Sequence, residues 1–295
     1  MPDVQKQPSA KIALLGGDLR QLAAKEALEG LGYSVAPYGF ATYGDPDSLS
    51  LEEALTGASV LLLPVPVLRN DRLNLPFGEE KLPLPVLLDR LTPYLSSIKA
   101  VFGGVLPPEL TEALAPRGIS LFDFCQEERF NILNAVPTAE GAIAIAMNHL
   151  DVTVCGAHMG ILGFGRIGKA LCRLLHALGA RVTVAARKDS DRALAELYGY
   201  HACDYDALPE EVGEWDVLFN TVPHTVVTEP VLAALGPKTV VIDLASKPGG
   251  VDCDAALRHS VTVIAALSLP GKVAPVTAGR ILADCLHRRL KEVMV

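Results

Sequence analysis

Several classes of protein are excluded by what this sequence has little of. Its six cysteines include no CxxC pair, and no cysteine–histidine cluster has the spacing of a zinc site, so we expect reduced thiols and no metal. No basic run is present, and the net charge of −8 argues against nucleic acid as the main partner. Residues 1–11 are polar and lack the apolar core of a secretory signal. The longest apolar runs, such as 60–68, are too short to span a bilayer. We therefore expect a cytoplasmic protein that does not enter a membrane.

What is present is the pattern of an α/β protein. The chain has 295 residues, of which 50% are hydrophobic and 20% charged, and this length suggests one or two domains with ample core. In the first half, short apolar runs alternate with segments of helical period; these runs are residues 11–15, 34–38, 60–63, 100–102 and 119–122. Such alternation favours a mostly parallel sheet covered by helices.

The most informative motif is Gly-Phe-Gly-Arg-Ile-Gly at residues 163–168. It follows the apolar run 159–162 and opens a segment of helical period, which is the context of a dinucleotide-binding fingerprint. Gly163 permits a tight turn, Gly165 lets a pyrophosphate approach the backbone, and Gly168 lets helix and strand pack closely. The helix N-terminus adds N–H donors and a positive dipole end. We therefore expect a dinucleotide here, with Arg166 and Ile167 in the same site.

The choice of cofactor depends on the end of the following strand. NAD-specific domains carry an acidic residue there, about twenty residues beyond the glycines, which binds the ribose hydroxyls. This chain reads Ala185-Ala186-Arg187-Lys188 at that place and has no carboxylate. Two cations suit a 2′-phosphate. We expect NADP(H), bound through Arg187 and Lys188, with NAD(H) as the alternative.

Loops after the later strands add further candidates, because ligands bind at the carboxyl edge of a parallel sheet. Thr221, Val222 and Pro223 follow one apolar strand, and Asp243 lies at the end of the next. We assign these four residues to the cofactor. Lys247 follows Asp243 in the same loop and is a candidate for a substrate carboxylate.

The first half begins like a second nucleotide unit but departs from the fingerprint. After the strand 11–15 the chain reads Gly16-Gly17-Asp18, which would place the Asp18 carboxylate where a pyrophosphate sits. We therefore expect a nucleotide-like fold without a nucleotide. Arg20 would then be free to face a substrate, unless it is a solvated arginine at a helix start. The long segment 68–85 is either a lid or an insertion.

A hinge is expected between the two halves. Thr138 reads as the N-cap of a helix over residues 138–150 that would bridge two domains. Asn134, Thr138 and Glu140 would lie at the mouth of the cleft as substrate contacts. The predicted fold is thus two doubly wound, Rossmann-like domains with a cleft between them. The first is residues 1–137, on which a C-terminal helix 276–295 packs; the second, dinucleotide-binding domain is residues 138–275.

Four further stretches are more specific than the glycine fingerprint. They are Gly16-Gly17-Asp18-Leu19-Arg20-Gln21, Asn134-Ala135-Val136-Pro137-Thr138-Ala139-Glu140-Gly141, Asp243-Leu244-Ala245-Ser246-Lys247-Pro248-Gly249-Gly250 and Leu269-Pro270-Gly271-Lys272-Val273-Ala274-Pro275-Val276-Thr277-Ala278-Gly279. With the fingerprint, in this order and over nearly the whole chain, they resemble the A subunit of dipicolinate synthase from spore-forming bacteria. The resemblance implies oxidation of dihydrodipicolinate to dipicolinate with a nicotinamide cofactor in the sporulating mother cell. It also implies a partner, the flavoprotein-like B subunit of the same enzyme, and we expect a homo-oligomer.

Roles within the site follow from position and chemistry, since the resemblance supplies no secure catalytic assignment. Oxidising the substrate ring requires loss of a hydride and a proton, so a base is needed, and Glu140 is the candidate. The two substrate carboxylates need cations or N–H donors. The candidate substrate residues are Arg20, Asn134, Thr138, Lys247 and Lys272, with Lys247 also counted as catalytic. The role of His224 stays open.

Two other functions remain open at this point. One is a 2-hydroxyacid or alanine-dehydrogenase-like oxidoreductase. The hydroxyacid enzymes carry an arginine after the fifth strand and a late histidine, where this chain has Ser246-Lys247 and Leu269-Pro270-Gly271. The other is a non-catalytic dinucleotide-binding scaffold for a partner enzyme, which an impaired cofactor site would favour.

Overall fold

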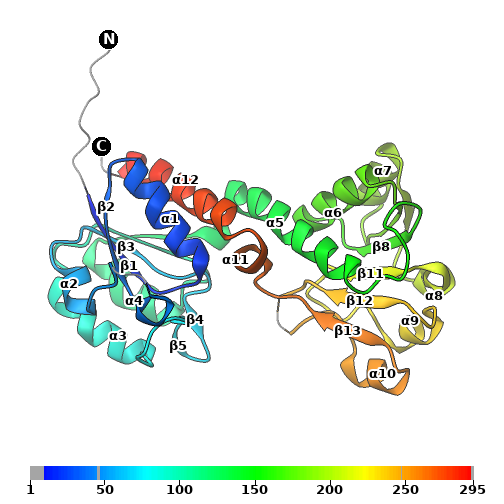
Figure 1. Cartoon of the computed structure of the whole chain (residues 1–295), viewed down its shortest axis with the longest axis horizontal. Helices are drawn as coiled ribbons and strands as arrows, with labels where there is room; N and C mark the ends of the chain where they lie inside the picture. The colour runs from blue at the N-terminus through cyan, green and yellow to red at the C-terminus, as the bar shows by residue number, and fades with distance from the viewer. Residues whose placement is uncertain (1–9, 45–46, 247, 294–295) are drawn as a thin grey trace, which may run out of the picture. The chain divides into compact units, whose positions relative to one another are not determined.

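The chain consists of two compact α/β units, shown in Figure 1. This computed structural model describes residues 10–44, 47–246 and 248–293. Unit 1 comprises Met1–Leu133 and Ala274–Val295, and unit 2 comprises Asn134–Val273. Each unit contains one parallel sheet with helices on both faces, so the predicted class of two doubly wound domains is confirmed.

The sheet of unit 1 has five parallel strands in the order β2-β1-β3-β6-β7. The strands are β1 (Lys11–Leu15), β2 (Ser34–Tyr38), β3 (Val60–Leu62), β6 (Ala100–Gly103) and β7 (Ser120–Asp123). Alternate residues of β1 enter different cores, because neighbouring side chains of a strand point to opposite faces. Ala13 and Leu15 lie in one core and Ile12 and Leu14 in the other. The order reverses between β1 and β3, which is where ligands bind in such sheets.

Helices cover both faces of this sheet. One face is covered by α2 (Leu51–Leu55), α3 (Leu84–Leu91) and α4 (Pro108–Leu114), and the other by α1 (Leu19–Gly30), α12 (Pro275–Val293) and the start of α5 (Glu128–Met147). The α12 helix lies directly against α1. A Cβ on Gly279 would be 2.5 Å from the carbonyl oxygen of Arg20, so the absent side chain permits this close approach.

Segment 68–85 is more ordered than a polar loop. It contains a two-stranded antiparallel hairpin of β4 (Leu68–Arg69) and β5 (Arg72–Leu73) and then enters α3. Short 3₁₀ turns occur elsewhere, namely η1 (Ala41–Tyr43), η2 (Thr92–Tyr94), η3 (Ala115–Arg117), η4 (Phe124–Gln126) and η5 (Val212–Glu214).

Unit 2 has six parallel strands in the order β10-β9-β8-β11-β12-β13. The strands are β8 (His158–Leu162), β9 (Arg181–Ala185), β10 (His201–Cys203), β11 (Val217–Asn220), β12 (Val240–Asp243) and β13 (Thr262–Ala265). Counted from β8 the spatial order is third, second, first, fourth, fifth and sixth, which is the arrangement of dinucleotide-binding domains. The helices are α6 (Arg166–Ala177), α7 (Asp189–Leu197), α8 (Leu208–Glu211), α9 (Glu229–Ala234), α10 (Cys253–Arg258) and α11 (Leu269–Val273).

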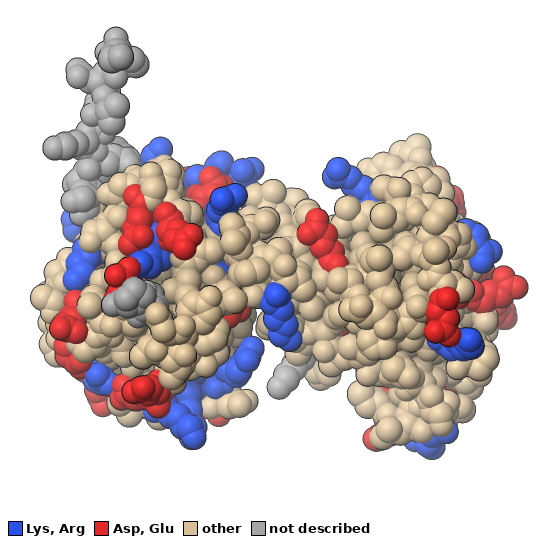
Figure 2. Space-filling view, viewed as in Figure 1, with Lys and Arg blue, Asp and Glu red and all other residues tan. Residues whose placement is uncertain are grey.

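Charged side chains are distributed over both units. Figure 2 shows Lys and Arg interspersed with Asp and Glu on the visible face, without an extended basic surface. This distribution agrees with the excess of 34 acidic over 26 basic residues in the sequence.

The expected start of a helix at Thr138 is wrong. The α5 helix runs from Glu128 to Met147 and contains Pro137 in its interior. Thr138 does not cap it; its hydroxyl donates to the carbonyl of Asn134 at 2.9 Å, within the helix. Proline removes one helical hydrogen bond, but packing on both sides of Pro137 compensates. Phe130 is buried in the core of unit 1, and Ala139 is buried in that of unit 2.

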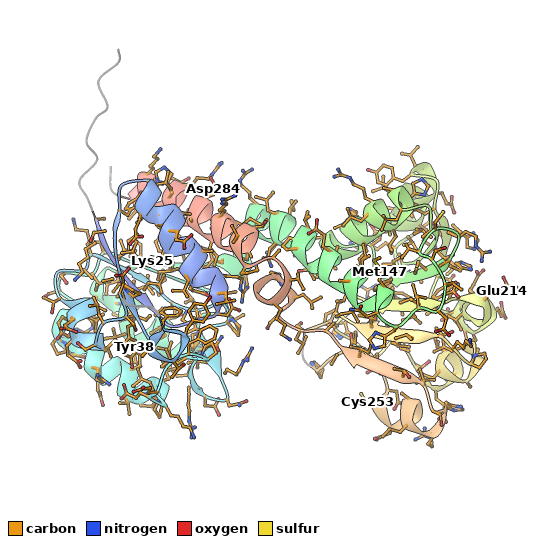
Figure 3. All side chains as sticks on the ribbon, in the orientation of Figure 1. Lys25, Tyr38, Met147, Glu214, Cys253 and Asp284 are labelled. Carbon is orange, nitrogen blue, oxygen red and sulfur yellow. The ribbon has the colours of Figure 1, made fainter. Side chains whose placement is uncertain are left out.

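By length and composition, α5 alone among the helices of the described residues could cross a membrane. Half of its apolar window is buried inside the protein, however. Ala139, Ala142, Ile143 and Ala146 pack into the core beneath the sheet of unit 2, and the exposed Met147, labelled in Figure 3, closes the helix. Packing therefore accounts for the apolar character of α5.

Candidate functional site

The glycine turn after β8 has the geometry that a dinucleotide requires. Gly163 has φ +93°, and a Cβ there would lie 2.5 Å from the Thr221 hydroxyl oxygen. A Cβ on Gly168 would lie 2.1 Å from the carbonyl oxygen of Gly163, so this glycine allows α6 to pack against the turn. Gly165 differs from both, because beyond its chain neighbours no atom of the described residues lies within 4 Å of the position that a Cβ would occupy there. Space is therefore open beside the backbone where a pyrophosphate would approach.

The N-terminus of α6 is not closed by a side chain of its own. Gly165 is the N-cap residue and supplies no side-chain hydrogen bond. The first backbone N–H groups of a helix need an outside partner, and an anion satisfies them well. The open space at Gly165 and this uncapped helix start fit a dinucleotide phosphate. Arg166 and Ile167 lie in the first turn of the helix, as the motif requires.

The loop after β11 is held against the glycine turn. The Thr221 hydroxyl donates to the carbonyl of Leu162 at 2.8 Å, joining the ends of β11 and β8. A Cβ on Gly163 would also lie 2.9 Å from the side chain of Val222. Pro223 and His224 are exposed beyond this point. Thr221 and Val222 thus form one wall of the turn at the place where the strand order reverses.

Asp243 is an anchor for the end of β12 and the residues that follow it. It is 9% exposed, and its carboxylate accepts hydrogen bonds from the Asn220 amide at 2.8 Å and from the backbone N–H groups of Ala245 and Gly250, both at 3.1 Å. These bonds use both carboxylate oxygens and fix Ala245 and Gly250 at this edge. We therefore infer that Asp243 shapes the cofactor edge rather than presenting a free carboxylate to it.

Asn220 was missed from the sequence, although it organises the same edge. It is fully buried; its Oδ1 accepts from the N–H of Val222 at 3.1 Å and its Nδ2 donates to the carbonyl of Val222 at 3.0 Å. Its register partner in the neighbouring strand is Asp243. A polar residue at the carboxyl end of each of two apolar strands was the available signal, because such ends meet at one edge of a parallel sheet.

The two cations expected to select the cofactor lie after β9. Arg187 and Lys188 are exposed, and no described ion pair involves either of them. Arg192 holds the backbone here, donating to the carbonyls of Ala186 at 2.9 Å and Arg187 at 3.1 Å. It also binds the Asp189 carboxylate at 3.0 Å. The nearest acid in sequence is therefore engaged by Arg192, which leaves Arg187 and Lys188 available to an anion.

Arg20 is not the free side chain that the sequence suggested. Its side chain is 5% exposed; Nε and Nη2 both donate to the Asp18 carboxylate at 2.9 Å, and Nη2 also donates to the carbonyl of Val65 at 2.6 Å. Asp18 in turn caps α1 through the N–H of Arg20. Leu75 covers the adjacent turn, where a Cβ on Gly16 would lie 2.3 Å from it. The nucleotide-like crevice of unit 1 is thus filled by its own chain.

The other candidate substrate residues lie in different environments. Asn134 has its Oδ1 buried without a hydrogen-bond partner among the described residues. Thr138 is buried and bonded within α5, whereas Glu140 and Lys272 are exposed on α5 and α11. Lys247 lies outside the described residues. No described contact brings these side chains together, so their common role stays a prediction. No group of three or more potential metal ligands occurs among the described residues.

Comparisons with known proteins agree with this division. Residues 11–125 match the family described as the N-terminal domain of the dipicolinate synthase A subunit. Residues 139–255 match the family described as D-isomer specific 2-hydroxyacid dehydrogenase, NAD binding domain. Unit 2 is accordingly a nicotinamide-dinucleotide-binding domain of the dehydrogenase type, which makes the chain an oxidoreductase by family.

Individual relatives match nearly the whole length of the chain. The A subunit of dipicolinate synthase from Bacillus subtilis (strain 168) is 32% identical over 96% of both chains. The crystal structure of the corresponding protein from Bacillus halodurans has a TM-score of 0.85 and 32% identity, covering 96% of this chain and 98% of that one. An L-alanine dehydrogenase structure, with a TM-score of 0.64 at 15% identity over 96% of this chain and 90% of that one, shares the fold. The chain therefore belongs to the family of dipicolinate synthase A subunits.

Proposed function

We propose that this chain oxidises dihydrodipicolinate to dipicolinate with a nicotinamide dinucleotide. One observation carries the proposal: a chain of this family has a dinucleotide turn with open space at Gly165 and an uncapped helix behind it. The open space lies at the start of α6, where free backbone N–H groups suit a phosphate. The unimpaired turn therefore favours an oxidoreductase over a scaffold with an impaired cofactor site, and the substrate of the proposed reaction makes the oxidised group a CH–CH group.

The chemistry divides between cofactor and protein. Aromatisation of the dihydropyridine ring removes one hydride and one proton, and a bound nicotinamide dinucleotide supplies the hydride acceptor. The protein must hold the ring and take the proton. We assign the proton to the carboxylate of Glu140, which is exposed on α5, and a supporting catalytic role to Lys247. Because an aromatic product is favoured, correct positioning supplies much of the catalysis.

The binding residues are proposed from the geometry given above. The cofactor residues are Gly163, Gly165, Arg166, Ile167, Gly168, Arg187, Lys188, Thr221, Val222 and Pro223, with Asp243 as the anchor of their edge. The substrate residues are Asn134, Thr138, Lys247 and Lys272. The Arg20 guanidinium is bonded to Asp18 and to the carbonyl of Val65, so we propose that Arg20 acts on the substrate only indirectly, by fixing the loops that contain these two residues.

We infer that NADP(H) is preferred over NAD(H). The exposed cations Arg187 and Lys188 have no described carboxylate partner, and a 2′-phosphate would supply one. The setting that we propose is the cytoplasm of the mother cell during sporulation. The relatives are named as one subunit of a synthase, which supports a partner chain. We take that partner to be the flavoprotein-like B subunit, and we propose a homo-oligomer of the chain itself.

Purified chain mixed with NADP⁺ and freshly prepared dihydrodipicolinate tests the reaction. We expect pyridine absorbance and NADPH to appear together, in equal amounts. Parallel reactions use NAD⁺, a 2-hydroxyacid substrate, and the added B subunit. Oxidation of the hydroxyacid alone would assign the chain to the dehydrogenases that unit 2 resembles. NADPH binding without turnover, with activity restored only by the B subunit, would make it a cofactor-bearing scaffold.

A further inference from the structure

The hairpin in unit 1 carries two arginines opposite each other. Asn70 and Asp71 form its turn and have φ of 52° and 58°, as the two central residues of a type I′ turn do. The register pairs Arg69 of β4 with Arg72 of β5. Directly opposed residues of an antiparallel pair project from the same face, with Cβ atoms about 5 Å apart. The two guanidinium groups therefore share one face of the hairpin.

Neither arginine forms a described ion pair, although Asp71 lies in the turn between them. Arg69 and Arg72 are both exposed, and none of the ion pairs within the described part of the chain includes either residue. Like charges placed directly opposite each other on a strand pair destabilise it. An anion lying between the two guanidinium groups would remove the repulsion and gain bidentate hydrogen bonds. Figure 2 shows Lys and Arg beside Asp and Glu along the lower edge of unit 1, and Figure 1 places β4 and β5 at the lower right of that unit.

The base of the hairpin is fixed to the ligand-binding edge of the sheet. The N–H of Gly17, after β1, donates to the carbonyl of Asn74 at 2.9 Å, and the N–H of Val67 donates to the carbonyl of Gly104, after β6, at 2.8 Å. The N–H of Asn74 closes the base by donating to the carbonyl of Val67 at 2.9 Å. The hairpin thus rises from the carboxyl ends of β1, β3 and β6, beside the point where the strand order reverses.

The interior of that edge is occupied near β1 by side chains of unit 1 itself. The side chains of Arg20 and Asp18 form an ion pair with each other, and Leu75 fills the space above Gly16. A ligand that binds at this edge must therefore meet groups that project beyond it. The charged residues of the hairpin are Arg69, Asp71 and Arg72, all exposed, and of these only the two arginines carry the charge that an anionic ligand needs.

We propose that Arg69 and Arg72 form a carboxylate-binding site and hold a carboxylate of the substrate in unit 1. The inference rests on the proposed function for the identity of the ligand, a planar ring dicarboxylate. It transfers to the hairpin the role that the sequence had suggested for Arg20. Both guanidinium groups are flat donors whose geometry matches a carboxylate.

Binding of the product tests the site without any turnover. Dipicolinate is titrated by calorimetry into wild-type chain, R69Q, R72Q and the double variant, and R117Q serves as the matched control. Arg117 is also exposed, lies in unit 1 and has no described ion pair. We expect each single variant to lose about tenfold in dipicolinate affinity, roughly one charge-assisted contact, and the double variant to lose more. NADPH affinity should be unchanged.

A merely structural role for the arginines predicts a different result. Relief of like-charge repulsion should leave the melting temperature of R69Q and R72Q at or above that of wild type, whereas loss of structural contacts would lower it. Wild-type dipicolinate affinity in the double variant, or no saturable binding by the wild type, would overturn the site. Loss of binding to the B subunit, with dicarboxylate binding intact, would instead assign the pair to a protein partner. Arginine-dependent dipicolinate binding in a chain that cannot oxidise dihydrodipicolinate would retain the site and remove only the proposed function.

Discussion

At the scale of single residues, the three fingerprint glycines have different physical reasons for being glycine. Gly163 and Gly168 are required by the protein itself, because a Cβ at either position would meet its neighbours within 2.5 Å. Gly165 is not required by any described neighbour. Close approach of a pyrophosphate is the role that the fingerprint gives to this glycine, so substitution at Gly165 should separate cofactor binding from folding.

We predict that Gly165→Asp abolishes dinucleotide binding while the protein stays folded. The added carboxylate would occupy the open space and repel the pyrophosphate, so NADPH affinity should fall more than ~100-fold, about 2.7 kcal/mol. Fluorescence titration with NADPH measures the loss, and circular dichroism checks the fold. Gly30→Asp is a matched control, because Gly30 lies in unit 1 and, beyond its own helix, also has no described atom within 4 Å of its Cβ position. Affinity in Gly165→Asp equal to that of the control would remove the basis of the proposed cofactor site.

The cofactor preference depends on the residues after β9. We predict that Arg187→Ala narrows the ratio of NADP(H) to NAD(H) affinity about tenfold or more, since a charged hydrogen bond contributes roughly 1.5–3 kcal/mol. NAD(H) affinity itself should change little. Arg173→Ala is the control, because Arg173 is exposed on α6 in the same unit. A wild-type chain that already binds NAD(H) more tightly would contradict the charge argument.

The contacts of single side chains were harder to predict than the fold, and Arg20 illustrates the reason. The structure shows that the Asp18 carboxylate caps α1, and the exclusion of a phosphate there stays a prediction. The sequence could not show that the guanidinium of Arg20 turns back onto the same carboxylate and reaches Val65, which is far away in the chain. Where several hydrogen-bond partners are near a side chain, tertiary packing determines which of them it binds. The local sequence pattern does not contain that information.

At the scale of elements, period and glycine placement indicated most strands of the two parallel sheets, but not the edge strand β10, the β4–β5 hairpin or the start of α5. The strand at residues 159–162 lies within β8, because a short apolar run before a glycine turn has few alternatives. The start of α5 was misplaced. Locally, Pro137 and a possible N-cap at Thr138 both indicate a helix start, and the residues before them show too little amphipathic pattern to indicate an earlier one. The helix persists through Pro137 because its two ends are buried in different cores.

The contact between α1 and α12 yields a prediction at the same scale. Alanine ordinarily stabilises a helix by up to about 1 kcal/mol relative to glycine. At Gly279 a Cβ would lie 2.5 Å from the Arg20 carbonyl oxygen and 2.7 Å from the Ala24 nitrogen, so the helices must separate. Overpacking of this kind costs about 1–3 kcal/mol, and we predict that Gly279→Ala is destabilised in urea unfolding. Gly30→Ala, in open space at the end of α1, should be neutral or stabilised. Equal stability of the two variants would show that α12 does not pack as described.

At the scale of the whole molecule, each unit contains a partly buried histidine whose pKa is lowered. In unit 2, burial lowers the pKa of His158, whose Nε2 lies 2.8 Å from the Thr183 hydroxyl and whose Nδ1 is buried without a partner among the described residues. In unit 1, burial lowers the pKa of His287, whose Nδ1 lies 2.8 Å from the Tyr33 hydroxyl. Both rings are therefore held neutral in the folded chain more strongly than in the unfolded one.

The consequence is a loss of stability in acid that involves both units. A histidine with a lowered folded pKa binds more protons when unfolded, so stability is complete above the unfolded pKa of about 6.5 and is lost as the pH falls below it towards the folded value. We predict that the free energy of unfolding decreases from about pH 6.5 downwards. In His158→Gln and in His287→Gln the free energy of unfolding should fall less steeply with decreasing pH. The double variant should show the smallest slope, because the two sites lie in separate units and their effects add. Urea unfolding at several pH values measures the slopes. His149→Gln is the control, since His149 is exposed just after α5 and its ring has one described hydrogen-bond partner, the Ile145 carbonyl. Slopes of the two variants that match this control would mean that carboxylates alone cause the acid sensitivity.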